Sequence, residues 1–371
     1  YPNYYLKPEN VETWEAGLEA KFLKNRIGVD IALYQSDVTD QIYDVPYDYI
    51  TGAKYYTTNV GLIRNKGIEI ALNFTPIKTK DWKWTIGINA SRNIGVLKRM
   101  YDGWNNANPF QEDYGTTIGS RLFVYDYVGK KMGELWGLGL QQAPEGSFYL
   151  DENGNQVDCS GMDIINAKTG LPAFDDSSNL KYYGNVNPDW LGGLTTSLKW
   201  RDITLNATFT GQIGGKTASV TAGILGYQGK LKNTLEGRND GLVAPGVNAI
   251  KAADGSITYQ KNNTITTDIV SYYSTYKANR YNIEEYIYDN SFFKLKELTV
   301  SYNFPKKLME KTKVIQGITV SAYATNLFCI TNYPFYDPEV TGYVGSNTKR
   351  GIESGSLPMT RSFGANIKIR F

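Results

Sequence analysis

RSFGANIKIRF, residues 361–371, alternates between apolar and polar side chains over its whole length. A period of two residues indicates a β-strand, because successive side chains of a strand point to opposite faces. The face opposite the apolar one carries Lys368 and Arg370, so it meets water rather than a packed core. The alternative for this segment alone is an ordinary edge strand of a soluble sandwich. The apolar face comprises Phe363, Ala365, Ile367, Ile369 and Phe371.

The same alternation recurs along the rest of the chain. The phase of 292–304 slips near Lys296, which indicates a β-bulge, and Pro76 is expected to end the third strand. The hairpin that would turn at Gly129 has the least regular pattern of the set. The predicted strands are 13–22, 27–33, 59–74, 82–91, 121–128, 130–140, 190–200, 203–213, 292–304, 318–328 and 361–371.

Short and long connections alternate between these strands. Tight turns follow residues 22, 76 and 200, whereas the longest connections, about 141–189 and 214–290, are polar. This order is typical of an outer-membrane barrel with tight periplasmic turns and extended surface loops. The turns also bring large aromatic side chains to one end of the sheet, where a girdle of such residues marks the lipid interface. Its predicted members are Phe22, Phe74, Trp82, Trp84, Trp200, Phe304 and Phe371.

The predicted fold class is all-β, a transmembrane antiparallel β-barrel. Counting gives about 11 strands, of which the first and the last run in the same direction. A closed up-and-down barrel needs an antiparallel first and last strand, so this odd set cannot close on itself. No linker or composition break divides the chain. Residues 1–371 are therefore expected to form one unit that is part of a larger barrel.

The composition excludes several kinds of chemistry. The chain of 371 residues has a net charge of +2 with scattered charges, which argues against nucleic acid as a partner. Histidine is absent, which excludes Ser-His-Asp and Cys-His catalysis and His-based zinc sites. The sequence has no apolar run long enough to predict a transmembrane helix, and the lack of an initiator Met and an apolar leader predicts a mature or cut product. Cys159 and Cys329 lie in expected loops or strand tips, and whether they pair stays open.

Seven segments, which follow one another in a fixed order, resemble the SusC/RagA-type TonB-dependent outer-membrane transporters. Any one of them is a weak match, but seven in order are specific, and together they extend over almost the whole chain. The segments are YLKPENVETWEAGLEAKFLKNRIGVDIALYQS, TNVGLIRNKGIEIALNFTPI, GNVNPDWLGGLTTSLKW, NTLEGRNDGLVAPGVN, DNSFFKLKELTVSYNFP, ATNLFCITNYPFYDPEV and RSFGANIKIRF.

The resemblance implies that residues 1–371 form the C-terminal half of a barrel of about 22 strands. It implies TonB-energised import of oligomeric nutrients, most often glycans and in other members oligopeptides, in the outer membrane of a Gram-negative bacterium. The implied partners are an N-terminal half with a plug domain, a SusD-like surface lipoprotein that closes as a lid, and the TonB complex, reached through the N-terminal part. A dimer of transporter–lipoprotein pairs is implied as well.

Two loop segments mix aromatic and polar side chains. Sugar rings stack on aromatic faces while Asp and Asn bind hydroxyl groups, so these residues are candidate substrate contacts. The alternative is that they pack the loops together or against a lid. The candidates are Tyr101, Asp102, Trp104 and Asn105 in one segment, and Tyr182 and Tyr183 in the other.

DENGNQVDCSGMD, residues 151–163, places side-chain oxygens at spacings that resemble a calcium loop. Gln156 stands where such loops place a glycine, and the closing bidentate Glu is missing. Two interpretations therefore stay open, Ca²⁺ or Mg²⁺ in a surface loop or a solvated loop with Asx turns. No other cofactor is predicted. The candidate ligands are Asp151, Asn153, Asn155, Asp158 and Asp163.

Glu15, Glu19 and Glu69 share the polar face of their strands and superficially resemble the paired carboxylates of a glycosidase. Carboxylates are expected on a wet barrel wall in any case, so the sequence does not predict an enzyme. The rival from another class is a secreted all-β carbohydrate-binding module or glycosidase with the same aromatic, His-free surface. The two hypotheses differ in one testable respect: the apolar faces of the strands contact lipid in a barrel and are buried inside the protein in a secreted module.

Overall fold

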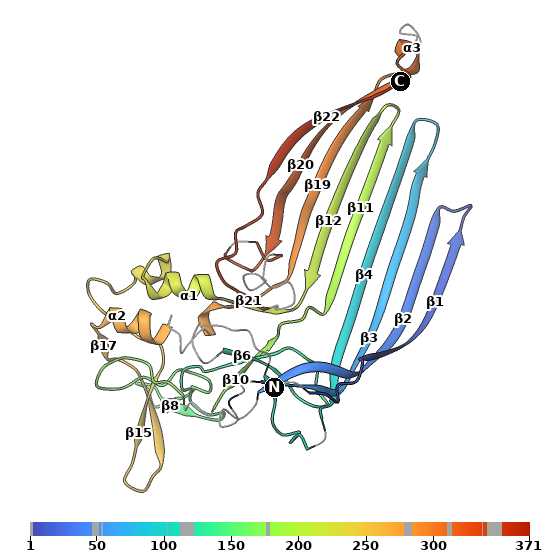
Figure 1. Cartoon of the computed structure of the whole chain (residues 1–371). Helices are drawn as coiled ribbons and strands as arrows, with labels where there is room; N and C mark the ends of the chain where they lie inside the picture. Colours follow the sequence, from blue (N-terminus) through green and yellow to red (C-terminus); the bar gives the residue numbers. More distant parts are fainter. Residues whose placement is uncertain are drawn as a thin grey trace.

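A computed structural model describes residues 3–46, 52, 55–101, 103–111, 122–175, 179–277, 284–309, 314–335, 337–339 and 351–371. Nine long strands form one antiparallel sheet, which we call the wall (Figure 1). Its strand order, β1-β2-β3-β4-β11-β12-β19-β20-β22, runs between two open edges. The strands are β1 (Asn10–Phe22), β2 (Ile27–Pro46), β3 (Tyr55–Lys78), β4 (Trp82–Arg99), β11 (Trp190–Trp200), β12 (Ile203–Ile213), β19 (Phe292–Asn303), β20 (Gly317–Thr331) and β22 (Ser362–Arg370).

Tight turns at one end of the wall fix the register of its hairpins. Phe22 pairs with Ile27 across the first turn, where Lys24 and Asn25 adopt φ values of 56° and 62°. Trp200 pairs with Ile203 across the Arg201-Asp202 turn. The first turn has four residues between the paired positions and the second has two, and Arg201 of the second also lies in the left-handed region, with φ 50°. Left-handed residues suit a two-residue turn, because the turn then follows the twist of the strands. The hairpins predicted at these positions are confirmed.

Large aromatic side chains gather at this turn end of the wall. The rings of Trp82 and Trp200, which are direct cross-strand partners, lie with centroids 5.7 Å apart. Phe22 and Phe371 are 53% and 71% exposed. Exposed rings at one level of a sheet are typical of a lipid interface. The predicted position of the aromatic residues is therefore confirmed.

Apart from α3 (Lys306–Met309), which lies at the turn end between β19 and β20, the remaining elements lie at the other end of the wall and form what we call the loop region (Figure 1). It contains four small sheets with the strand orders β10-β7-β6-β5, β18-β13-β21, β14-β17 and β15-β16-β8-β9. Their strands are β5 (Phe110–Gln111), β6 (Leu122–Asp126), β7 (Glu134–Gly137), β8 (Phe148–Leu150), β9 (Gln156–Asp158), β10 (Lys181–Asn185), β13 (Lys216–Ser219), β14 (Leu242–Val243), β15 (Val247–Lys251), β16 (Ile257–Lys261), β17 (Ile265–Thr266), β18 (Ile287–Asp289) and β21 (Ile352–Glu353).

The described helices are short. The longest is α1 (Val220–Tyr227), which follows β13 and is capped by the Ser219 hydroxyl, since this oxygen accepts a hydrogen bond from the Ala222 backbone nitrogen. Along the described parts of the chain, none of the helices has both the length and the apolar character needed to cross a membrane. The others are η2 (Lys232–Leu235), α2 (Ile269–Ser271), η3 (Tyr272–Lys277), η4 (Glu284–Tyr286) and α3 (Lys306–Met309).

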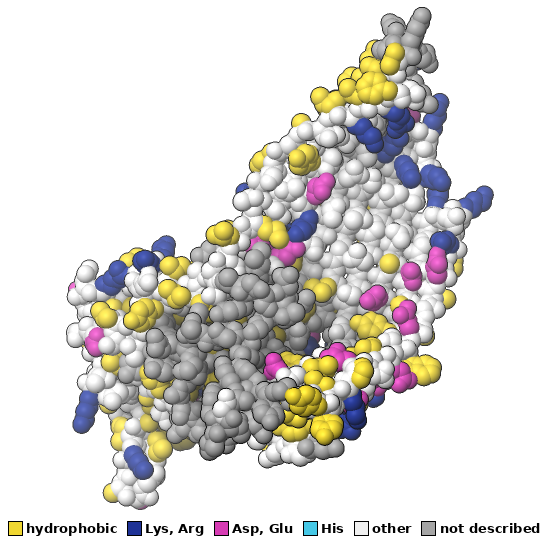
Figure 2. Space-filling model, in the orientation of Figure 1, with side chains coloured by type: hydrophobic (Ala, Val, Ile, Leu, Met, Phe, Trp, Pro, Cys, Tyr) yellow, Lys and Arg dark blue, Asp and Glu magenta, His cyan; other side chains and the backbone are white. Residues whose placement is uncertain are grey.

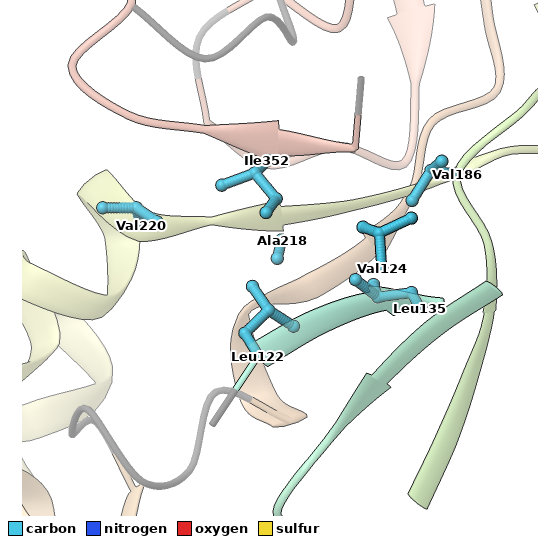
Figure 3. Packing of buried hydrophobic residues seen from close by; sticks show 7 residues of the cluster. All are labelled: Leu122, Val124, Leu135, Val186, Ala218, Val220 and Ile352. Carbon is cyan, nitrogen blue, oxygen red and sulfur yellow. The ribbon is translucent and has the colours of Figure 1, made fainter. Parts of the chain in front are cut away.

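The loop region holds a compact apolar core of its own (Figure 3). Leu135 and Val124 are 0% and 1% exposed, and they pack against Ala218 and Ile352 from the sheet that contains β13 and β21. Segments far apart in the sequence therefore meet in one cluster, which joins the loops to one another. The full set is Leu122, Val124, Leu135, Val186, Ala218, Val220 and Ile352.

Two expectations about the wall need correction, and a third is confirmed. The predicted hairpin 121–128 and 130–140 exists as β6 paired with β7, but it belongs to a separate sheet, so the wall has nine strands rather than about 11. These strands of five and four residues are too short to span a bilayer, and they bury Leu122 and Val124 against protein.

β3 continues through Pro76 as far as Lys78, with an irregular register after Phe74. The bulge predicted near Lys296 is confirmed by the register shift at that residue.

Candidate functional site

The polar face of the wall, which we call the luminal face, forms a shallow hollow. A depression of about 560 Å³ is lined by Glu15, Asp30, Glu69, Asn89 and Ser91, among others. The strand pairing explains this grouping, because Glu69 lies opposite Ser91 on β4 and Ala32 on β2. Figure 2 shows Asp and Glu side chains on this face nearer the loop region, and Lys and Arg side chains nearer the turn end. The arrangement is a charged, open surface with no enclosed reaction chamber among the described residues.

Five aromatic rings form a continuous row along the β10-β7-β6-β5 sheet and the residue after β6; Tyr182 is exposed and the other four are half-buried, and we call this set the aromatic row. Neighbouring ring centroids lie 5.2 to 6.2 Å apart. The Lys130 ammonium lies 4.6 Å from the Tyr127 ring centroid, and Trp136 donates its indole N–H to Glu134. Such a surface offers apolar contact area with charged groups at its rim. The row comprises Phe123, Tyr125, Tyr127, Trp136 and Tyr182.

Tyr182 and Tyr183, predicted together as substrate contacts, occupy different environments. Tyr182 pairs with Trp136 and is 53% exposed. Tyr183 sits at a bulge of β10 and packs against the apolar core, where its hydroxyl is buried without a hydrogen-bond partner. Burial, together with the nearby carboxylates of Glu284 and Asp175, raises the pKa of the Tyr183 hydroxyl. Only Tyr182 presents its ring on an exposed surface.

The first predicted segment packs onto the loop-region ends of β3 and β4. The rings of Tyr101 and Trp104 meet edge to face with centroids 5.5 Å apart, and both pack against a cluster that includes Leu97 and Phe110. Asn105 uses its side-chain oxygen to accept a hydrogen bond from the Ala107 backbone, which forms an Asx turn. Asp102 lies outside the described residues. In this segment the structure favours loop packing over exposed ligand contacts.

The predicted cation loop is a hairpin between β8 and β9. The Asp151 carboxylate accepts hydrogen bonds from the backbone nitrogens of Asn153 and Asn155, and these bonds hold the pKa of this carboxyl below its usual value. Asp158 accepts a hydrogen bond from the Ser160 backbone at the other end of the hairpin, and Asp163 bonds with the Gln142 amide. The described residues contain no group of three or more His, Cys, Asp or Glu side chains placed to hold a metal. Cation binding by these residues stays a prediction.

The two cysteines do not pair. Cys159 is buried and Cys329 is exposed, and both are free thiols. Cys159 packs beside Ala143, Ile164 and Val247, where burial raises the pKa of its thiol. The question that the sequence left open is therefore decided in favour of two separate thiols.

A buried ion cluster that the sequence did not reveal joins the wall to the loop region. Lys294 of β19 is only 2% exposed, and its ammonium donates to Asp337 and, at 3.2 Å, to Glu339. Lys296 donates to both Glu339 carboxylate oxygens at 2.7 Å. Two cations and two carboxylates thus balance in charge. The phase slip near Lys296 was the sequence signal at this place, but nothing in the sequence paired it with 337–339.

The comparisons with known proteins identify the class of this fold. A family model described as "TonB dependent receptor-like, beta-barrel" matches residues 1–327. The chain belongs to this family. All of the chain aligns with TonB-dependent receptor P3 of Formosa agariphila at 25% identity, over 35% of that protein, and with TonB-dependent receptor SusC of Bacteroides thetaiotaomicron at 24% identity, over 32%. The chain therefore spans about a third of the length of these curated relatives.

A solved structure shares the fold. The structure of the RagAB peptide transporter matches 97% of this chain and 35% of the solved chain, with a TM-score of 0.67 and 19% sequence identity. At this identity the likeness describes the fold alone. It agrees with the antiparallel wall and with the SusC/RagA-type resemblance carried by the seven sequence segments.

Proposed function

We propose that the chain is part of the barrel of a TonB-energised outer-membrane importer of the SusC/RagA type, which takes up oligomeric nutrients. The observation that carries the proposal is the two-sided wall. Its outer face exposes large apolar side chains, including Leu18, Leu33 and Ile367 at 63%, 53% and 65%, while its inner face is polar and charged. Lipid on one side and water on the other match these two faces. No catalytic role is proposed.

The open edges of the wall support a partner that completes the barrel. β1 and β22 each pair on one side only, and both run from the loop region towards the turn end. An unpaired strand edge in hydrocarbon costs several kcal/mol for each unsatisfied backbone group. We propose that an N-terminal half carrying a plug domain supplies the missing strands, and that a SusD-like lipoprotein, the TonB complex and a second transporter–lipoprotein pair complete the assembly.

Glycans are the proposed substrate class, and the aromatic row supports this choice. Contiguous rings with polar groups at their rim suit sugar rings, which present both apolar C–H faces and hydroxyl groups. In the intact transporter, Trp136→Ala and Tyr182→Ala are expected to weaken oligosaccharide binding several-fold. Tyr227→Ala is a matched control, because Tyr227 is also exposed, at 58%, and lies outside the row. An equal loss of oligosaccharide affinity in all three variants would show that the aromatic row is not part of the binding site.

Oligopeptides are the second candidate substrate class. The observation in their favour is the fold shared with the RagAB peptide transporter. Uptake by membrane vesicles of size-matched oligosaccharides and oligopeptides distinguishes the two classes. Saturable uptake of the peptides alone would replace the glycan proposal while leaving the transporter class in place.

A surface cation is proposed only for the 151–163 segment, as Ca²⁺ or Mg²⁺. The supporting feature is its spacing of side-chain oxygens, from Asp151 to Asp163. Calorimetric titration of the intact protein with each ion, repeated on Asp151→Asn, tests this role. Identical heats for the two proteins would dismiss it.

The alternative function, a secreted all-β carbohydrate-binding module or glycosidase, is tested by the solubility of the protein without detergent. The exposed apolar face of the wall should require detergent or lipid, because no protein segment among the described residues covers it. A monodisperse protein in plain buffer would contradict the barrel. The family assignment favours the transporter.

A further inference from the structure

Three lysines lie side by side on the luminal face at the turn end of the wall. Lys83 of β4 is the direct cross-strand partner of Lys78 on β3 and of Lys199 on β11. Direct partners in an antiparallel sheet have Cβ atoms about 5 Å apart, and like charges at this position repel. We call Lys78, Lys83 and Lys199 the lysine row.

No counter-ion for the lysine row exists among the described residues. All three side chains are exposed, and no carboxylate of the described chain lies within ion-pair distance of them. Two other cations at the turn end of the wall do have acidic partners. Lys21 pairs with Glu19, and Arg201 lies 3.5 Å from Asp81 in the adjacent turn. Asp81, in the turn between β3 and β4, therefore already faces Arg201.

The position of the row limits what can neutralise it. The alternation of β4 places Trp82 and Trp84 on the face opposite Lys83, and Trp82 stacks on Trp200 at the lipid interface. The lysines consequently point away from the lipid face and into the lumen. Figure 2 shows cations grouped at this end of the inner face. A partner must reach them from inside the barrel.

We propose that the lysine row binds an acidic protein segment, one that presents carboxylates to the luminal wall at the turn end. The curated relatives are about three times as long as this chain, so members of the family contain ample further polypeptide for this purpose. The inference rests on the proposed closed barrel and adds the partner's charge and contact point. Charge complementarity of this kind fixes orientation and register.

The sign of one thermal shift tests the proposal. In the full-length transporter, Lys83→Gln with Lys199→Gln should lower the temperature at which the folded barrel loses its fast, unheated gel mobility, because carboxylates of the partner lose their cations. Without an acidic partner, the same change removes like-charge repulsion and leaves that temperature equal or higher, which would overturn the proposal. Lys83→Arg with Lys199→Arg keeps the charge and should behave as the unmodified protein. Lys24→Gln, in the neighbouring turn, is the matched control.

Two further readouts separate the remaining explanations. A zero-length carbodiimide should link Lys83 or Lys199 to an Asp or Glu outside residues 1–371, and links restricted to this chain would overturn the proposal. A thermal shift seen in vesicles of anionic lipid and lost in zwitterionic lipid would assign the row to lipid headgroups and also overturn it. Substrate uptake, measured on the same variants, reports separately on the proposed transport function.

Discussion

The wall and the loop region differ in how far their large apolar side chains are buried within the protein. In the wall, Ile367 and Phe363 are 65% and 74% exposed, although β22, which carries both, is paired with β20 along its whole length. In the loop region, Leu135 and Ile352 are 0% and 1% exposed within a protein core. The difference fits the proposed membrane location, in which lipid would cover the apolar face of the wall while the loops bury their own apolar side chains. Changes of the same chemical kind should therefore have different consequences in the two regions.

The largest effect is expected at the seam between the two regions. Lys294→Met removes the ammonium that lies against Asp337 and Glu339 and leaves buried carboxylate charge uncompensated, which should cost about 3–5 kcal/mol of stability. Urea unfolding of the reconstituted protein, followed by tryptophan fluorescence, measures this loss. Lys296→Met is the control, because the Lys296 side chain is 32% exposed and its ion pair should contribute about 0–1 kcal/mol. Similar losses in both variants would show that burial does not decide the value of these pairs.

A cavity in the loop region should be the next largest effect. Leu135→Ala empties a site that is 0% exposed and is expected to cost about 2–5 kcal/mol. Its counterpart in the wall is Leu205→Ala, at 37% exposure on the outer face, where lipid chains fill the vacated volume. Hydrogen exchange of the β6–β7 hairpin reports the first change, and heat-dependent gel mobility reports the second. A wall variant as damaged as Leu135→Ala would mean that protein, rather than lipid, covers Leu205.

A charge on the wall sharpens the distinction between its two faces. Ile88→Arg places a cation on the outer face, opposite Leu72 and Leu194, and should cost about 2–4 kcal/mol at mid-membrane depth. Asn89→Arg, the next residue along β4, points into the luminal hollow and should cost little. The yield of folded barrel in outer membranes measures both. Equal impairment would mean that the faces have been assigned wrongly.

Acid should produce the smallest effect, confined to the β8–β9 hairpin. Backbone and side-chain hydrogen bonds lower the pKa of Asp151, so the carboxylate stabilises the hairpin above the pKa of the unfolded chain. This contribution is lost as the pH falls through the lower folded pKa. Limited proteolysis of 148–158 over the range from neutral to acid pH should show faster cleavage at the acid end. In Asp151→Asn the dependence should flatten; an unchanged pH profile would exclude Asp151 as its source.

Sequence pattern predicted the exposure of the candidate aromatic residues only in part. Tyr182, predicted from a mixed aromatic and polar stretch, has an exposed ring, and its contact with substrate stays a prediction. The four other rings of the aromatic row were missed, because they belong to a hairpin that the sequence had assigned to the wall. Tyr183 adjoins Tyr182 in sequence, but a bulge turns its ring into the core. The sequence around Tyr182 and Tyr183 therefore does not indicate which of the two rings is buried by packing of the loops.

By itself the sequence determined the class of fold, the two faces of the wall, its tight turns and the end at which the aromatic residues gather. These features follow from the period of two along each strand and from turn chemistry, both of which act over a few residues. Only the tertiary structure decided the nine-strand count, the separate sheet of β6 and β7, and the ion cluster of Lys294 with Asp337 and Glu339. Those depend on contacts between segments up to hundreds of residues apart, as when Leu135 meets Ile352. Such contacts are chosen by packing density and charge balance in three dimensions, which no local periodicity records.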